Sequence, residues 1–226
     1  MSIPEFRPMS VKIKICGIKT HEALEAAVEA GADLFGLVFF PRSPRNIGEA
    51  DARALIDSAG PDAKSVALLV DPSDEDVTRI CDRVGPDYIQ LHGRETPERV
   101  GQIKRACGRK LIKAVHVAGP GDAEEAARFG DHADIILYDA KAVTNGPGQL
   151  PGGNGVPFDW RLLEGVKGSS AFMLSGGLSP DNVASAIGAT RAAMVDVSSG
   201  VERAPGEKDP ELIRQFIEAA RSASVS

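Results

Sequence analysis

The sequence lacks several features that define other classes of protein. Its 226 residues include only three cysteines, at positions 16, 81 and 107, and no two of them form a CxxC pair. This spacing argues against a disulfide framework and against a structural zinc site. No window approaches the roughly 18 apolar residues that a membrane span needs, and the opening MSIPEFRPMS has no apolar signal-peptide core. We therefore expect a cytoplasmic protein.

An excess of basic charge is also missing. Lysine and arginine number 26 against 32 aspartate and glutamate residues, which gives a formal net charge of −6. Nucleic acids recruit basic surfaces, so a nucleic-acid partner is disfavoured. An anionic small molecule would have to be held by local charges or backbone dipoles. With 42% hydrophobic residues, the chain can bury the core of one large domain or of two small ones.

Short apolar runs alternate with amphipathic segments along the whole chain, which predicts alternating strands and helices. Several helical segments begin with Ser, Thr or Asp, carry Pro in their first turn, or close with Gly, as capped helices do. The eight predicted strands cover residues 11–16, 34–40, 65–70, 87–92, 111–117, 134–139, 171–176 and 192–198.

Eight βα units in a chain of this length favour an α/β fold of the (β/α)8 TIM-barrel type. We expect one domain over residues 1–226, with 1–10 as an N-terminal extension and 218–226 as the end of the last helix and the tail. A doubly wound open sheet is the alternative. It would place a GxGxxG fingerprint after the first strand, and CGIKTHEA contains none.

Polar residues gather where the predicted strands end. The carboxyl ends of all strands of such a barrel meet at one face, and active sites lie there. Packing alone does not require this ring of polar groups, so we predict a ligand site at that face. Its members are Cys16, Arg45, Asp71, Gln90, His92, His116, Asp139, Ser175, Gly176, Gly177, Asp196, Ser198, Ser199 and Gly200.

Two neighbouring loops carry a glycine-rich pattern, SGGLSPDN after the seventh strand and VDVSSGVE after the eighth. An anion can approach a glycine backbone closely because no Cβ stands in the way, and backbone N–H groups can then hold a phosphate. Two ordinary turns are the alternative. The occurrence of both loops in adjacent units at the same end favours a phosphate site.

Cys16 is a candidate base. Cys81 and Cys107 lie on apolar helical stripes and are interpreted as small core residues, whereas Cys16 ends a strand just before Gly17. A thiol there could act as a base if a nearby cation lowered its usual pKa of about 8.5. Lys19 is a candidate for that cation by its place in the sequence.

Asp139 ends the apolar run IILYD. It is either a cap or partner for Lys141, or a carboxylic acid whose pKa is raised by a partly apolar site. Position alone does not decide between these readings.

The loop FFPRSPRN, stiffened by Pro41 and Pro44, supplies Arg42 and Arg45. A guanidinium fork suits a carboxylate ligand, although a solvated basic loop is the alternative. His92 could be a satisfied polar residue at a strand end. No His, Cys or carboxylate cluster has the spacing of metal ligands in the sequence, so we predict no metal.

Taken together, these motifs resemble the phosphoribosylanthranilate isomerase family of tryptophan biosynthesis. The resemblance covers nearly the whole chain in order, and the joint order is more specific than any one piece. It is carried by KICGI (14–18), FGLVFFPRSPRNI (35–47), IQLHG (89–93), IKAV (112–115), LYDAK (137–141), GGNG with FDW (152–160), LSGGLSPDNV (174–183) and VDVSSGVE with PGEKD (195–209).

The resemblance implies an isomerase that converts N-(5-phosphoribosyl)anthranilate to the carboxyphenylamino-deoxyribulose phosphate by an Amadori rearrangement. It implies that Cys16 is the general base, Asp139 the general acid, and Arg45 the group that binds the anthranilate carboxylate. The substrate supplies its own electron sink, so no cofactor is implied. The remaining predicted substrate-binding residues, all but Gly153 and Gly155 from the strand-end ring, are Gln90, His92, Gly153, Gly155, Gly176, Gly177, Asp196, Ser199 and Gly200.

One departure from the family pattern lies in the sixth loop. Members often carry Lys and Thr before FDW, where this chain has Val156 and Pro157, so a lysine contact to the phosphate is lost there. We expect the longer loop over 140–157 to form a lid that is mobile without ligand. The pattern leaves open whether the protein is a monomer or a homodimer, and whether it acts on a related aminoaldose of histidine biosynthesis.

Two other kinds of phosphate-binding barrel are the alternatives to this family. Indole-glycerol-phosphate synthase, a barrel of the same pathway, needs a catalytic lysine and glutamates at strand ends, whereas Lys14 and Lys113 fall inside predicted strands. A phosphate-binding regulatory barrel without activity would have no reason to keep Cys16 and Asp139 together in the ring.

Overall fold

The computed structural model of the protein describes residues 11–117, 121–140 and 172–223. The predicted lid over 140–157, apart from its first residue, lies outside these ranges, as do Gly153 and Gly155. None of the helices in the described ranges is long and apolar enough to cross a membrane.

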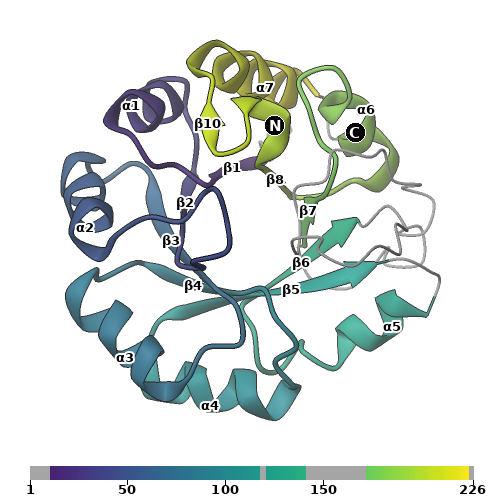
Figure 1. Cartoon of the computed structure of the whole chain (residues 1–226). Coiled ribbons are helices and arrows are strands. Elements are labelled where there is room, and N and C mark those ends of the chain that lie inside the picture. Colours follow the sequence, from purple (N-terminus) through teal and green to yellow (C-terminus); the bar gives the residue numbers. More distant parts are fainter. Residues whose placement is uncertain (1–10, 118–120, 141–171, 224–226) are drawn as a thin grey trace, which may run out of the picture.

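Eight parallel strands close into a barrel in the order β1 to β8, with β8 pairing back onto β1. The view along the barrel in Figure 1 shows the strands as an inner ring and the helices as an outer ring. The (β/α)8 prediction is therefore confirmed. The strands are β1 (Lys12–Cys16), β2 (Leu34–Val38), β3 (Lys64–Leu69), β4 (Tyr88–Leu91), β5 (Lys110–Val117), β6 (Ile135–Ala140), β7 (Met173–Ser175) and β8 (Met194–Val197).

The helices follow the strands that they cover. They are α1 (His21–Glu29), α2 (Glu49–Ser58), α3 (Asp74–Arg83), α4 (Pro97–Cys107), α5 (Asp122–Ala127), α6 (Val183–Thr190) and α7 (Pro210–Ser222). A short 3-10 helix, η2 (Ser199–Val201), and a two-stranded hairpin, β9 (Glu202–Ala204) with β10 (Glu207–Lys208), stand between β8 and α7. The hairpin was not predicted.

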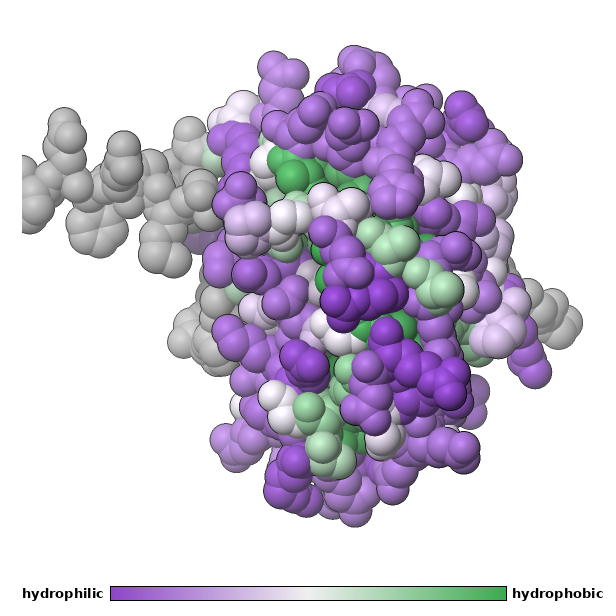
Figure 2. Space-filling model, turned by 90° about the vertical axis from the view of Figure 1, so that its left-hand side faces the viewer, coloured by the Kyte–Doolittle hydropathy of each residue, from purple (hydrophilic) through white to green (hydrophobic). Residues whose placement is uncertain are grey.

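Local chemistry explains where several helices begin. The side chains of Thr20, Ser73, Thr96 and Asp209 accept hydrogen bonds from backbone N–H groups in the first turns of α1, α3, α4 and α7, which satisfies donors that the helix itself cannot pair. Helix α4 ends at Gly108, which adopts a left-handed conformation with φ of 61° as a glycine does at little cost. Figure 2 shows that hydrophilic residues predominate on the face that carries α2.

The core has two parts, because successive side chains of a strand point to opposite faces. Ile13 and Ile15 belong to the large cluster that also takes in the buried faces of the helices. Residues of the other parity fill the barrel interior, where Leu34, Ile112 and Met173 belong to one cluster and Cys16, Val38 and Leu68 to another. Cys16 therefore points into the barrel.

Candidate active site

A pocket opens at the carboxyl ends of the strands, the face at which the polar ring was predicted. It has an empty volume of about 730 Å³ and is open to solvent. Its lining brings together residues from β1, β2, β3, β4, β6, β7 and β8 and from the loops that follow β2, β3, β4, β7 and β8. Of the predicted site residues, those that line it are Cys16, Arg45, Gln90, His92, Asp139, Gly176, Gly177, Asp196 and Ser199.

Three members of the predicted ring do not line this pocket in the described part of the chain. Asp71, which accepts a hydrogen bond from the backbone N–H of Arg94 (2.6 Å), ties the loop after β3 to the loop after β4. His116 contacts Asp139, at 3.3 Å from Nδ1 to Oδ2, and is not among the residues that line the cavity. Gly200 serves packing, because a Cβ at this position would lie 1.9 Å from the carbonyl oxygen of Leu178.

Cys16 ends β1 with its side chain toward the pocket and is buried. Burial raises the pKa of its thiol, the charge of Lys14 opposes this, and the charge of Asp196 adds to it, so the net direction is upward. This differs from the lowered pKa on which the expectation for a base depended. The proposed cation was also wrong, because Lys19 donates a hydrogen bond to the carbonyl of Pro44 (2.9 Å), and the lysine beside the sulfur is Lys14.

Lys14 and Asp196 form an ion pair inside the barrel. Lys14 has no exposed surface, and its Nζ lies 2.7 Å from Oδ1 of Asp196. The other carboxylate oxygen of Asp196 accepts a hydrogen bond from Ser175 Oγ at 2.9 Å. The network therefore joins β1, β8 and β7 and ends on the strand next to the one that carries Asp139.

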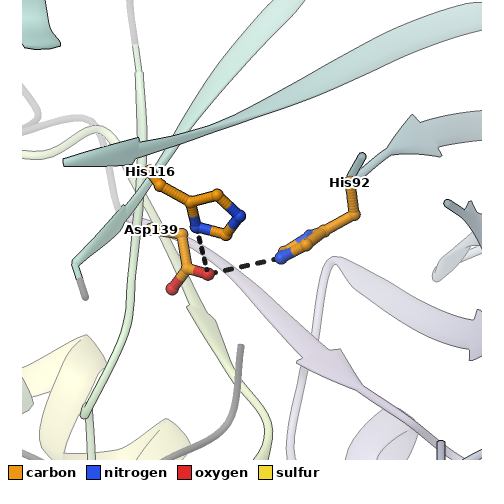
Figure 3. Close-up of side chains that lie close together, drawn as sticks. All are labelled: His92, His116 and Asp139. Carbon is orange, nitrogen blue, oxygen red and sulfur yellow. Dashed lines mark hydrogen bonds and ion pairs between the residues drawn. The ribbon is translucent and has the colours of Figure 1, made fainter. Parts of the chain in front are cut away.

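Asp139 is buried on β6, and two histidines approach the same oxygen of its carboxyl group (Figure 3). The distances to Oδ2 are 3.3 Å from Nε2 of His92, which directly follows β4, and 3.3 Å from Nδ1 of His116 on β5. Burial by itself would raise the pKa of Asp139, but the contacts with His116 and His92 outweigh it and hold the pKa well below its usual range. The raised pKa that an apolar site would have produced is therefore not found.

The ligand atoms of His92, His116 and Asp139 all lie within 4.8 Å of one another, a spacing that could also admit a metal ion. Sequence spacing gave no sign of this cluster, because its members come from three successive strands. Gln90 approaches His92 from the other side, at 3.0 Å from Gln90 Nε2 to His92 Nδ1. Its Oε1 is buried with no hydrogen-bond partner among the residues that the structure describes, which leaves an acceptor for a ligand.

Arg45 reaches the pocket from the loop after β2 and is held by Glu202. Its Nε and Nη2 each lie 2.7 Å from a different oxygen of the Glu202 carboxylate. Lys208 also contacts Glu202, at 2.6 Å from Nζ to Oε1, and donates a hydrogen bond to the carbonyl of Ser198. The unpredicted β9–β10 hairpin therefore supplies the carboxylate that orients the predicted carboxylate-binding arginine.

The two glycine-rich loops meet at one side of the pocket. Gly176 and Gly177 have φ angles of 92° and 65°, values that residues with a Cβ rarely adopt. Ser199 begins η2 in the next loop, and all three residues line the pocket. This arrangement brings the backbone of both loops toward one cavity, as a bound phosphate requires.

The sequence reasoning missed Lys14, Glu202 and Lys208 as parts of this site. For Lys14 a signal was present: it stands two residues before Cys16 in an apolar strand, and residues two apart on a strand share a face. No comparable local signal existed for Glu202 and Lys208, because their contacts depend on how the hairpin folds over the barrel mouth.

Comparison with known proteins gives a consistent result. A family model described as N-(5'-phosphoribosyl)anthranilate (PRA) isomerase matches residues 13–219. The chain is 52% identical over 215 residues to the N-(5'-phosphoribosyl)anthranilate isomerase of Rhodopseudomonas palustris (strain BisB5), covering 95% of this chain and 98% of that protein. It is 48% identical over 215 residues to that of Parvibaculum lavamentivorans, covering 95% of this chain and all of the relative.

Solved structures agree. The phosphoribosyl anthranilate isomerase of Thermotoga maritima is 37% identical with a TM-score of 0.82, and the match covers 93% of this chain and 98% of that one. A structure of such an isomerase in complex with reduced 1-(o-carboxyphenylamino)-1-deoxyribulose 5-phosphate is 36% identical with a TM-score of 0.81, with the same coverage.

Proposed function

Because the chain belongs to the N-(5'-phosphoribosyl)anthranilate isomerase family and catalyses that isomerisation in tryptophan biosynthesis, we propose that Cys16 is its general base and Asp139 its general acid. The observation that supports this most directly is that both side chains line one pocket. They lie on β1 and β6, three strands apart around the barrel, so a ribose bound between them can meet the acid and the base with different atoms.

The reaction needs one proton given and one removed. Asp139 protonates the furanose ring oxygen, the bond between that oxygen and C1 breaks, and a positively charged imine forms between C1 and the anthranilate nitrogen. This charge acidifies the hydrogen on C2. Cys16, as a thiolate, takes that proton and yields an enolamine, which tautomerises to the ketone. General acid and base catalysis of this kind is typically worth about 10²- to 10⁴-fold in rate.

Asp139 needs a proton before it can give one, although its contacts with two imidazoles favour the carboxylate. Imidazole groups change charge in the neutral range. We propose that His92, which also lines the pocket and whose Nε2 lies 3.3 Å from Oδ2 of Asp139, passes a proton to this carboxylate.

The substrate has two anionic groups, the anthranilate carboxylate and the phosphate, and each is assigned to its own set of residues. The fork of Arg45 toward Glu202 uses Nε and Nη2, so its Nη1 is the group that meets the anthranilate carboxylate. The phosphate is assigned to the backbone N–H groups of Gly176, Gly177 and Ser199. The ribose hydroxyls and the nitrogen that joins the ribose to the anthranilate ring are assigned to Gln90 Oε1, Asp196 and His92. Gly153 and Gly155 stay predicted phosphate contacts, and Gly200 supports the loop from behind.

The charge of the chain and one related structure support a proposal for location and assembly. The pathway chemistry and the low basic charge support the proposal that the protein works in the cytoplasm as a single barrel domain without a nucleic-acid partner. A related isomerase of Thermotoga maritima is described as dimeric, which supports a homodimer over a monomer. Light scattering on the eluting peak of a sizing column measures the mass and decides between them.

The test of the acid and base roles uses three variants. Cys16→Ala and Asp139→Asn should each reduce kcat by at least about 10²-fold while binding of the reduced product analogue is retained. Cys81→Ser is the matched control, because that thiol lies on α3 away from the pocket, and it should leave kcat unchanged. Parental turnover by either of the first two variants would refute the assignment.

A further inference from the structure

Lys14 is a buried charge that the proposed acid and base steps do not use. It lies on the inward face of β1, two residues before Cys16, and has no exposed surface. On the neighbouring strand, Gly36 is paired with Cys16, and a Cβ built there would lie 2.9 Å from the Cys16 sulfur and 3.2 Å from the Lys14 nitrogen. The sulfur and the ammonium group therefore border the same small space.

Because both atoms lie this close to the same point, the sulfur and the nitrogen are within about 6 Å of each other, and their charges interact. An opposite charge within about 4–6 Å favours the ionised form of a titratable group. Asp196 acts in the other direction, because its carboxylate holds the same ammonium at 2.7 Å and repels negative charge on the sulfur. The Cys16 sulfur thus stands between one group that favours its thiolate and one that opposes it.

We propose that Lys14 is a positioning residue that allows the Cys16 sulfur to carry negative charge, and that Asp196 limits this effect by competing for the same ammonium group. This role for Lys14 rests on the proposed role of Cys16 as base. It explains why an apolar strand carries a lysine that no solvent reaches, since a buried ion pair by itself is weak support for stability.

Other charges around the pocket do not replace Lys14. Strands β2 and β3 present the uncharged Val38 and Leu68 to the pocket. Lys208 also favours the thiolate, but it is bound to Glu202. The titratable and charged groups that face this side of the pocket are Lys14 on β1, Asp196 on β8, Glu202 on β9, Lys208 on β10, Arg45 after β2, His92 after β4 and Asp139 on β6.

The experiment measures charge on the sulfur directly. In a Cys81→Ser/Cys107→Ser background, Cys16 is the only thiol, and its thiolate absorbs near 240 nm. Absorbance is recorded against pH for this parent, for Lys14→Met, Lys14→Arg and Asp196→Asn, and for the Lys14→Met/Asp196→Asn double variant. Cys16→Ser in the same background provides the blank. Alkylation by iodoacetamide at pH 8 gives a second readout.

Lys14→Met should move the absorbance midpoint upward by roughly one pH unit or more and slow alkylation about tenfold. Asp196→Asn should move it downward and speed alkylation, and Lys14→Arg should stay near the parent. Midpoints that do not move, or that move the same way in Lys14→Met and Asp196→Asn, would overturn the proposal.

Lys14→Met leaves Asp196 buried and unpaired and could fail to fold. The double variant removes the whole pair, which proteins tolerate far better, and its midpoint should lie above the parent and below that of Lys14→Met. A double-variant midpoint at or below the parent would also overturn the proposal. Because the titration requires no turnover, a failed base role and a failed charge role give different results: kcat unaffected by Cys16→Ala would refute the first and leave the second measurable.

Discussion

Substituting Glu202 by Gln tests the buried network that holds Arg45 at the pocket. The Glu202 side chain is 4% exposed and contacts both Arg45 and Lys208, whose side chains are 10% and 2% exposed. Glutamine keeps the size of the side chain and one oxygen. It removes the charge that balances two buried cations, so the perturbation is electrostatic.

The expected loss follows from burial. Breaking a buried ion pair by removing one partner costs about 3–5 kcal/mol in the free energy of unfolding, and the remaining amide oxygen places the expected loss near the lower end, about 3 kcal/mol. Arg45 also loses one side of its clamp, and we expect KM for phosphoribosylanthranilate to rise about tenfold, the equivalent of about 1.4 kcal/mol, with a smaller change in kcat.

Glu207→Gln is the matched control. It removes a carboxylate from the same hairpin, but the Arg203–Glu207 pair is 66% and 58% exposed, and such surface pairs are worth about 0–1 kcal/mol. Urea unfolding followed by circular dichroism, with steady-state kinetics on the same preparations, measures both effects. If Glu202→Gln costs no more stability than Glu207→Gln, or leaves KM unchanged, the reasoning about this network is wrong.

Three further results are expected. Gly200→Ala should lower the free energy of unfolding by about 2 kcal/mol or more, because its Cβ would meet the carbonyl oxygen of Leu178 at 1.9 Å. Gly188→Ala is the control: its Cβ would have open space in helix α6, and the substitution should raise the free energy of unfolding by up to about 1 kcal/mol. Equal effects of the two substitutions in thermal and urea unfolding would contradict this. Burial by itself would raise the pKa of Glu202, but contacts with Arg45 and Lys208 hold this pKa below its ordinary value of 4.5. The stability that the Glu202 charge contributes is therefore present above pH 4.5 and is lost as the pH falls through the pKa of the folded state. The difference in free energy of unfolding between the parent and Glu202→Gln should become smaller on acidification, and a difference that grows would refute this. Dialysis against EDTA should leave kcat/KM unchanged, and a loss that zinc restores would show instead that the His92, His116 and Asp139 cluster holds an ion.

Much of the fold could be predicted because each strand carries its own signal. Strands such as Leu34–Val38 are buried along their whole length, and this produces the continuous apolar runs that parallel strands show in a sequence. The first residues of several helices could be predicted from the Ser, Thr and Asp side chains that cap them. The β9–β10 hairpin could not be read in the same way, because its strands are three and two residues long and mostly exposed, and so show no apolar pattern.

The site was predictable where position along a strand decides function, and not where contacts cross between strands. Cys16 and Asp139 were found because they end strands. Their protonation could not be read from the sequence, since it depends on Lys14 and Asp196 for the thiol and on His92 and His116 for the carboxyl. Lys14 shares a strand with Cys16, but only the pairing of neighbouring strands brings Asp196 to the thiol and the two histidines to the carboxyl.

The side chains inside the barrel form two layers, of which one stabilises the fold and the other belongs to the pocket. The layer farther from the pocket is apolar, with Leu34, Ile112 and Met173 in one cluster. Burial of such side chains is the dominant favourable contribution to folding. The part nearer the pocket holds the Lys14–Asp196 pair, which apolar residues of similar size could replace with little or no loss of stability. A charge pair placed where packing would do as well is most simply explained by the charge that it imposes on the neighbouring sulfur. The double variant that removes this pair should therefore unfold near the parental urea concentration yet shift the titration of Cys16, and a large loss of stability without such a shift would assign the pair to folding instead.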